Sequence, residues 1–215
     1  MLKNKQQLRQ AFVVYGLILL VWTFYRAIFW FPIWIEELVI KPAVFLLPVW
    51  IALRKEPKKL AYLGFRKNVF SASRWGMIFG LGYALVALWF NYLKYGRIEL
   101  ASFDLAGFNL WLFLGLFLVT ACSEEILFRG YLLKQFLKGW QNEWLAVGVS
   151  GLFFALIHLP ILFFNFEQNW SSIFIQLMLS LVVGWGNGVL MLRSANIVQP
   201  ILSHVFWGTA IFLFR

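Results

Sequence analysis

Long apolar runs separated by short polar connections make up the whole chain. A helix of about 20 apolar residues can cross the hydrocarbon core of a bilayer, and most of these runs approach that length. The pattern predicts seven membrane-spanning helices. Their expected ranges are 11–31, 42–52 after a turn over 32–41, 76–93, 108–128, 144–164, 171–192 and 197–214. A short amphipathic continuation of the fourth helix is expected to end near residue 139.

Composition supports the same class of protein. Of the 215 residues, 62% are hydrophobic and 13% are charged, as is typical of a chain that lies mostly in lipid. Because most residues belong to predicted spans, there is no room for a separate soluble domain. We therefore predict an all-α fold, a single polytopic transmembrane helical bundle of residues 1–215, located in a cell membrane (plasma or inner membrane).

The net charge of +10 bears on topology. Lys and Arg residues lie in short loops beside the apolar runs, where they orient the spans and meet anionic lipid. The most basic segments are the first ten residues and the loop at 54–59 with the residues just after it. By the positive-inside rule both are cytoplasmic, which places the N-terminus inside and, after seven spans, the C-terminus outside. We expect the lipid bilayer as a partner, and no nucleic acid.

Charged residues interrupt the apolar pattern most sharply at 123–130, at the cytoplasmic end of the fourth predicted span. Ionisable residues inside a membrane are costly, so a functional site is the default interpretation. Arg129 follows Glu125 by four residues, about 40° away around a helix, so the two can pair along one face. Glu124 points about 100° away from Glu125 and has no partner on its own helix. A structural ion pair thus explains Glu125 and Arg129 but not Glu124.

The only two histidines, His158 and His204, both fall inside predicted spans. Either one alone is readily explained as an interhelical hydrogen-bonding residue. Together with Glu124 they supply groups that activate water, by general base catalysis or on a bound metal. At about 1.5 Å per residue, Glu124 and His204 lie equally deep, about 10 Å from the cytoplasmic side. His158 comes out about 20 Å deep, one or two turns too far, unless its span starts later or tilts.

At these residues the chain resembles the CPBP family of intramembrane peptidases, the CAAX protease and bacteriocin-processing (Abi) family. The matching motifs are Glu124-Glu125-x-x-x-Arg129 within a segment that continues Gly130-Tyr131-Leu132, then Phe154-x-x-x-His158, then Pro200-Ile201-Leu202-Ser203-His204. The resemblance covers about residues 109–208, so residues 108–215 are interpreted as the catalytic core. Residues 1–107 hold three predicted spans without a recognised motif.

The resemblance implies an endopeptidase that hydrolyses a peptide bond within or beside the membrane. On this analogy Glu124 is the general base that activates water, and Glu125 with Arg129 holds the helix. His158 and His204 would position the water or stabilise the oxyanion. Family members have been described both as metalloproteases and as metal-independent glutamate proteases, so the cofactor stays open between none and zinc on Glu124, His158 and His204. Prenylated CAAX tails, leader peptides and other membrane-associated peptides or proteins are compatible substrates.

One position departs from the family pattern. Where the family usually has Asn or Asp four residues after the last histidine, this chain has Gly208. An amide there would donate to the oxyanion, a contribution of about 3 kcal/mol at comparable sites. Activity is then weak, depends on another donor such as Asn187 or Asn196, or is absent. Asn187 lies between glycines, a pattern that favours close helix packing over a catalytic role.

Two further interpretations stay open. Residues 148–151 read Gly-Val-Ser-Gly, the form of a rhomboid-type serine protease motif, with Ser150 as nucleophile and His204 as its base. That interpretation leaves Glu124 unexplained, and small residues line helix contacts in any membrane bundle. Cys122 as a nucleophile lacks the electropositive surroundings that activate a thiol. Alternatively the chain keeps the fold without the chemistry, as a scaffold or immunity membrane protein.

Overall fold

The computed structural model describes residues 2–98, 109–164 and 170–213, and every regular element in these ranges is a helix. The helices are α1 (Leu2–Ile28), α2 (Ile33–Ile35), η1 (Glu36–Ile40), α3 (Lys41–Ala52), α4 (Lys59–Leu63), α5 (Val69–Tyr95), α6 (Asn109–Glu125), η2 (Ile126–Leu132), α7 (Leu133–Trp140), α8 (Glu143–Leu156), α9 (Leu159–Phe164), α10 (Trp170–Ser194) and α11 (Val198–Leu213). The segments η1 and η2 are π-helical. The predicted all-α class is confirmed for the described residues.

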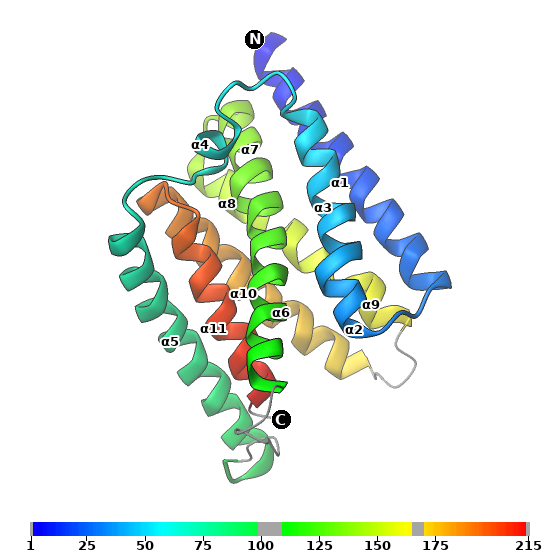
Figure 1. Ribbon diagram of the computed structural model, residues 1–215, viewed down its shortest axis with the longest axis vertical. Coiled ribbons are helices and arrows are strands. Elements are labelled where there is room, and N and C mark those ends of the chain that lie inside the picture. Colours follow the sequence, from blue (N-terminus) through cyan, green and yellow to red (C-terminus); the bar gives the residue numbers. More distant parts are fainter. Residues whose placement is uncertain (1, 99–108, 165–169, 214–215) are drawn as a thin grey trace.

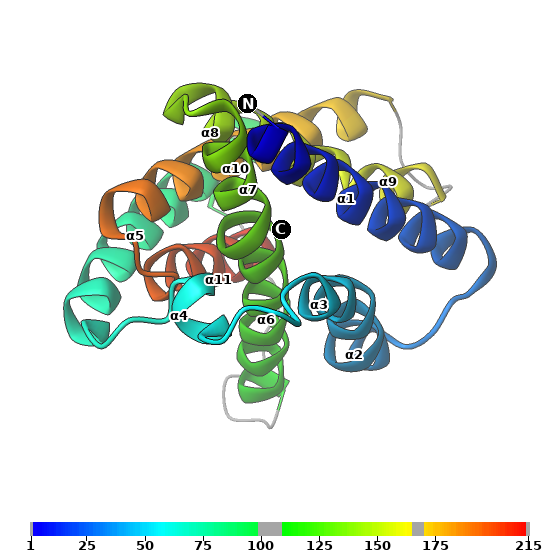
Figure 2. The ribbon, with the colours of Figure 1, turned by 90° about the horizontal axis from the view of Figure 1, so that it is seen from above.

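One long helix runs through the middle of the molecule. The elements α6, η2 and α7 follow one another without a break from Asn109 to Trp140, so the predicted fourth span and its continuation form a single helix. It lies between α1 and α3 on one side and α5 and α11 on the other (Figure 1). Seen from above, α6 again lies between α3 and α11 (Figure 2), and it contacts both. Residues on different faces of this helix therefore meet distant parts of the chain.

Residues 33–40, predicted to form a turn, are helical. The chain is continuously helical from α2 through η1 to the end of α3. Pro42 has no N–H and its ring crowds the carbonyl four residues back, which a regular α-helix does not accommodate without strain. Here the helix is widened, and the Lys41 N–H bonds to the Glu36 carbonyl oxygen five residues back. Lys41 is consequently part of a helix and is buried, not exposed in a loop.

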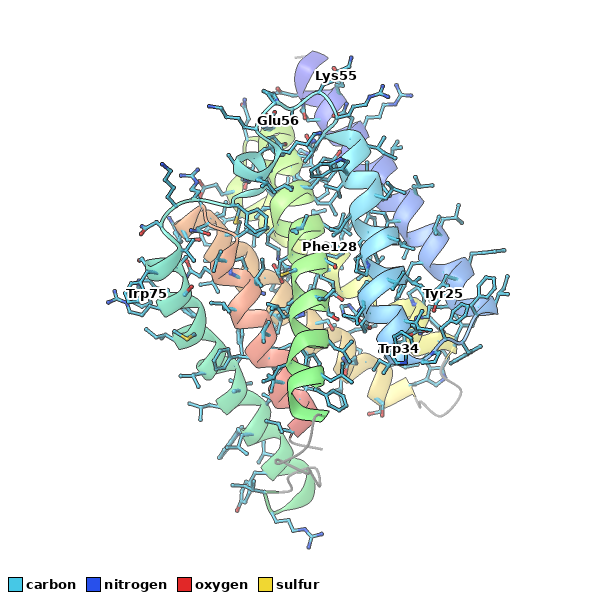
Figure 3. The ribbon with its side chains drawn as sticks, viewed as in Figure 1. Tyr25, Trp34, Lys55, Glu56, Trp75 and Phe128 are labelled. Atoms are coloured by element: carbon cyan, nitrogen blue, oxygen red, sulfur yellow. The ribbon has the colours of Figure 1, made fainter. Side chains whose placement is uncertain are left out.

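Four helices of the described part are long and apolar enough to cross a membrane. They cover Asn4–Ile28, Val69–Trp89, Glu143–Phe164 and Trp170–Ser194. Many large apolar side chains on these helices are exposed, as contact with lipid requires, and Trp75 lies on the outer side of α5 (Figure 3). The fold is that of a multi-pass helical membrane protein, whereas the count of seven spans stays a prediction.

Two glycines one helical turn apart let α5 approach α11 closely. A Cβ atom at Gly76 would lie 2.7 Å from the Gln199 carbonyl oxygen, and one at Gly80 would lie 2.7 Å from Cβ of Phe206. Small residues at such positions allow the backbones of membrane helices to come together. The glycines thus hold α5 against α11, the helix that carries His204.

Replacing Gly80 with Leu should force these two helices apart. Overpacking of this kind costs about 1–3 kcal/mol, so we expect a lower thermal unfolding midpoint for the detergent-solubilised protein. Gly82→Leu is the matched control on the same helix, because a Cβ atom at Gly82 meets nothing within 4 Å. Equal midpoints for the two variants would contradict the close contact between α5 and α11.

Candidate active site

Glu125 lies at the centre of a buried polar network. Its side chain has no exposed surface, and Oε1 is bonded by Arg129 Nη1 at 3.1 Å, Asn187 Nδ2 at 2.9 Å and His204 Nδ1 at 2.8 Å. These three partners come from η2, α10 and α11. A buried carboxylate is stable only when it is paired and hydrogen-bonded. The need to satisfy Glu125 therefore fixes three helical elements around one oxygen atom.

Arg129 is also fully buried, and it connects η2 to two further helices. Besides its bond to Glu125, Nη2 donates to the Gly184 carbonyl oxygen at 2.8 Å. The guanidinium lies 4.4 Å from the centre of the Phe154 ring, a favourable cation–π distance. The pair between Glu125 and Arg129 that the four-residue spacing predicts is confirmed.

The ring of His204 stands between the two adjacent glutamates. Nδ1 lies 2.8 Å from Glu125 Oε1, and Nε2 lies 3.7 Å from Glu124 Oε2. An ionised carboxylate only accepts, so Nδ1 donates the proton in the bond to Glu125. In the neutral ring, Nε2 is then an acceptor that faces Glu124. The structure thus brings together Glu124 and His204, which the helical rise places at equal depth.

Glu124 has a partner that the motif does not reveal, so the expectation of an unpaired carboxylate is wrong. Oε1 lies 3.2 Å from Nζ of Lys41, the first residue of α3. Oε2 is buried, faces His204, and has no hydrogen-bond partner among the described residues. One oxygen of Glu124 therefore meets a cation and the other meets an imidazole.

Lys41 is part of a longer row of contacts between η1, α3 and α6. Its Nζ lies 2.5 Å from Glu37 Oε2, and the Thr120 hydroxyl donates to that same oxygen at 2.5 Å. The sequence pattern does not reveal this role, because residues 32–41 are typical of a polar turn between two spans. The available signal is the spacing of Glu37 and Lys41, four residues apart at the start of an apolar run.

His158 lies at a break between α8 and α9. Pro160 lacks an N–H and its ring crowds the carbonyl of Leu156 four residues back, so α8 ends at Leu156 and α9 begins at Leu159. The His158 Nδ1 is 2.8 Å from the Phe154 carbonyl oxygen, and the Phe154 ring meets the rings of both His158 and His204 edge-on. His158 and His204 thus contact the same ring, while no hydrogen bond or ion pair joins His158 to Glu124 in the described part of the chain.

Of the two alternative amide donors, only Asn187 lies at this centre. Its Nδ2 donates to Glu125, and its Oδ1 accepts from the Ser203 hydroxyl at 2.7 Å. Asn187 thus joins α10 to Glu125 and to α11 by hydrogen bonds in addition to the helix packing that its glycine neighbours predict. Asn196 instead caps the start of α11, where its Oδ1 accepts from the Val198 N–H at 3.1 Å. Asn196 is thus occupied as a helix cap.

The other candidate nucleophiles are placed differently. The buried Ser150 hydroxyl donates to the Phe128 carbonyl oxygen at 3.0 Å, and in the described part of the chain no hydrogen bond joins Ser150 to His204. Gly151 packs against α10, where an added Cβ atom would overlap an indole ring. Residues 148–151 thus have the features of a helix contact. Cys122 is half-buried and forms no disulfide.

Gly208, which stands where the family usually has Asn or Asp, faces α6. A Cβ atom there would lie 3.0 Å from Cδ1 of Phe117, so a side chain at this position requires that ring to shift. Gly208, one helical turn after His204, thus leaves room for the Phe117 ring.

A groove of about 920 Å³ opens between α5 and the pair α10 and α11. Its lining includes Arg66, Arg193, Tyr83 and the alternative donor Asn196, but neither glutamate of the motif and neither histidine. The network of glutamates and histidines is therefore a buried centre and not the wall of this groove.

The fold and the site together define a multi-pass helical membrane protein in which two glutamates, His204 and a lysine meet at one buried centre, with His158 against the adjoining Phe154 ring. Residues 106–210, about half of the chain, match the family model described as type II CAAX prenyl endopeptidase Rce1-like. The resemblance that the motifs predict is confirmed, and this half of the chain belongs to the CPBP family. Comparisons with curated proteins and with solved structures gave no significant match. The family supports a protease of the CAAX type, while the roles of individual residues stay predictions.

Removing the Arg129 guanidinium should destabilise the whole centre. Arg129→Met leaves Glu125 buried without its cation, and breaking such a pair costs about 3–5 kcal/mol. We expect this loss in the free energy of unfolding, measured by denaturant titration in micelles. Arg193→Met removes an exposed arginine and serves as the control. If both variants were as stable as the unmodified protein, the buried pair would not be a main stabilising contact.

Proposed function

We propose that this protein is an intramembrane endopeptidase that hydrolyses a peptide bond with water activated by Glu124. The observation that carries the proposal is the different surroundings of the two adjacent glutamates. Glu125 is engaged through Oε1 by three hydrogen-bonding partners. Oε2 of each glutamate has no hydrogen-bond partner among the described residues, but only that of Glu124 faces the His204 Nε2, at 3.7 Å. Glu125 is thus suited to hold the neighbouring helices together, and Glu124 is suited to take a proton from water.

In the proposed mechanism Glu124 takes a proton from water, and the water oxygen attacks the carbonyl carbon of the substrate. The 3.7 Å between Glu124 Oε2 and His204 Nε2 suits one water that donates a hydrogen bond to each, leaving its lone pairs for attack. Glu125 holds the ring of His204 in the required tautomer through Nδ1. The protonated Glu124 then gives this proton to the leaving amine nitrogen as the C–N bond breaks, and the second proton of the water stays with the new carboxyl group.

His158 is proposed to orient this water. The Phe154 carbonyl oxygen accepts from Nδ1 of His158, so Nε2 is an acceptor when the ring is neutral. An acceptor can receive a proton from water but cannot donate to an oxyanion. A role in positioning the water, as an acceptor in place of His204 because a water has only two protons, therefore agrees better with this geometry than oxyanion stabilisation by neutral His158.

A zinc centre does not fit the residues at this site. A catalytic zinc ion needs three protein ligands and an open position. Among the described residues, no group of three or more His, Cys, Asp or Glu side chains is arranged to hold a metal ion. Moreover, the Lys41 ammonium lies 3.2 Å from Glu124, where it would repel a dication. The proposed mechanism therefore uses no metal.

The substrate is proposed to be a membrane-associated peptide or protein. The matched family is described as CAAX prenyl endopeptidases, so a prenylated CAAX tail is one such substrate, and a leader peptide is another. Both would bring their scissile bond to the membrane surface, which agrees with a buried site in a multi-pass bundle.

Replacement of Glu124 by Gln should abolish cleavage while the protein still accumulates in membranes. The amide is nearly the same size but cannot take a proton from water. The measurement is cleavage of a library of membrane-anchored peptides, prenylated and unprenylated, by purified protein. Ser150→Ala is the control and should retain activity, since its hydroxyl faces a backbone carbonyl. A chelator should have no effect.

Undiminished cleavage by Glu124→Gln would exclude the proposed mechanism. Loss of cleavage with Ser150→Ala alone would favour the rhomboid-type alternative, and loss with the chelator alone would favour a metalloprotease.

A non-catalytic scaffold or immunity protein is the second candidate function. The observation that favours it is Gly208, which faces Phe117 and provides no side-chain donor. A scaffold would keep its cellular phenotype when Glu124 is replaced by Gln, whereas a protease would lose it. The same substitution thus separates the two functions in cells.

For topology we propose seven spans in the plasma or inner membrane, with a cytoplasmic N-terminus. The arrangement supports this, because α1 begins and α11 ends at opposite ends of the molecule (Figure 1). Lys55 and Glu56, in the basic loop, lie at the end where α1 begins (Figure 3). Reporter fusions to the two termini should therefore report the N-terminus inside and the C-terminus outside. Two fusions on the same side would contradict an odd number of spans.

A further inference from the structure

Lys41 is a buried cation between two carboxylates. Its side chain is about one-tenth exposed, with Nζ 2.5 Å from Glu37 Oε2 and 3.2 Å from Glu124 Oε1. The Trp22 ring lies 5.9 Å from the same nitrogen. A lysine with so little access to water is stable only if carboxylates replace its hydration. Its position is therefore set by Glu37 and Glu124 together.

The contacts around Lys41 join the two halves of the chain. Glu37 and Lys41 lie in η1 and α3, whereas Thr120 and Glu124 lie in α6. Thr120 donates to the Glu37 oxygen that also meets Lys41, so Glu37 is held from both sides. Because Thr120 and Glu124 are four residues apart, they lie on the same face of α6. Two residues on one face of α6 thus contact two residues that lie one turn apart on the helix that contains Lys41.

We infer that Lys41 is a positioning residue for Glu124, a role that rests on the function proposed above. The ammonium holds Oε1 of Glu124, which leaves Oε2 turned toward His204. Without this contact the carboxylate is free to rotate about its side-chain bonds, and its geometry toward His204 is lost. Lys41 lies outside residues 106–210, so the matched segment alone does not contain the complete site.

This role predicts a loss in kcat with little change in KM. Lys41→Met keeps an unbranched side chain but removes the charge, and misplacement of a reacting group by about 1 Å costs on the order of 100-fold in rate. Lys41→Arg retains a cation and should recover part of that loss. The measurement is steady-state cleavage of a membrane-anchored peptide by purified variants, normalised to folded protein. If Lys41→Met does not accumulate, Lys41→Gln replaces it, since it also lacks the charge.

Arg26→Met is the matched control for stability. Arg26 forms a buried pair with Glu36 at 2.7 Å in the same part of the fold, and in the described part of the chain no hydrogen bond or ion pair joins either residue to Glu124. Removing this charge should lower stability without the selective loss in kcat. Lys59→Met, which removes a cation stacked on Trp50 at 4.5 Å, controls for net charge.

Unchanged kcat in Lys41→Met, or an equal loss in Lys41→Met and Arg26→Met, would overturn the inference. So would a Lys41→Arg variant no more active than Lys41→Met. These results are distinguishable from failure of the proposed function, which is measured with Glu124→Gln. If Glu124→Gln abolishes cleavage and Lys41→Met does not reduce it, the function stands and the positioning role falls. If Glu124→Gln cleaves normally, both fall.

Discussion

The structure depends on the desolvated pair of Glu125 and Arg129. Neither side chain has exposed surface, so their charges must be balanced by protein groups alone. Donors from α10 and α11 bond to Oε1 of the carboxylate, and a carbonyl of α10 and a ring of α8 contact the guanidinium, whereas Glu125 Oε2 and Arg129 Nε have no hydrogen-bond partner among the described residues. Helices in a bilayer gain little from apolar contact with one another, because lipid is equally apolar. Polar pairing of this kind can therefore determine which helices meet and in what register.

The second glutamate takes its surroundings from this arrangement. Glu124 lies on the same helix as Glu125 but points about 100° away around the helix axis. It therefore contacts Lys41 of α3 as well as His204 of α11. His204 joins the two residues, with one ring nitrogen on each carboxylate. A structural network on one side thus orients the imidazole that faces the proposed general base on the other. This separation of two adjacent carboxylates is the basis of the proposed chemistry.

Regular helical spacing predicts much of this arrangement. The helical class, the pair of Glu125 and Arg129, and the equal depth of Glu124 and His204 all follow from apolar run length and residue rise. The places where the structure differs from regular predicted helices and turns lie beside proline residues. Pro42 accompanies the π-turn that keeps Lys41 within a helix, where the polar pattern predicts a turn, and Pro160 accompanies a break in the helix at His158, where the depth is counted along a straight helix. The partners of Asn187 depend on contacts between distant helices, which spacing along one helix does not reveal.

The central claim is that the two adjacent glutamates have separate roles, and its most direct test compares Glu124→Gln with Glu125→Gln in two measurements, the free energy of unfolding and kcat for a membrane-anchored peptide. The account predicts that Glu124→Gln eliminates kcat but changes stability much less than Glu125→Gln, which breaks the buried pair with Arg129. Equal losses of stability in both variants, or a kcat that survives in Glu124→Gln, would contradict it.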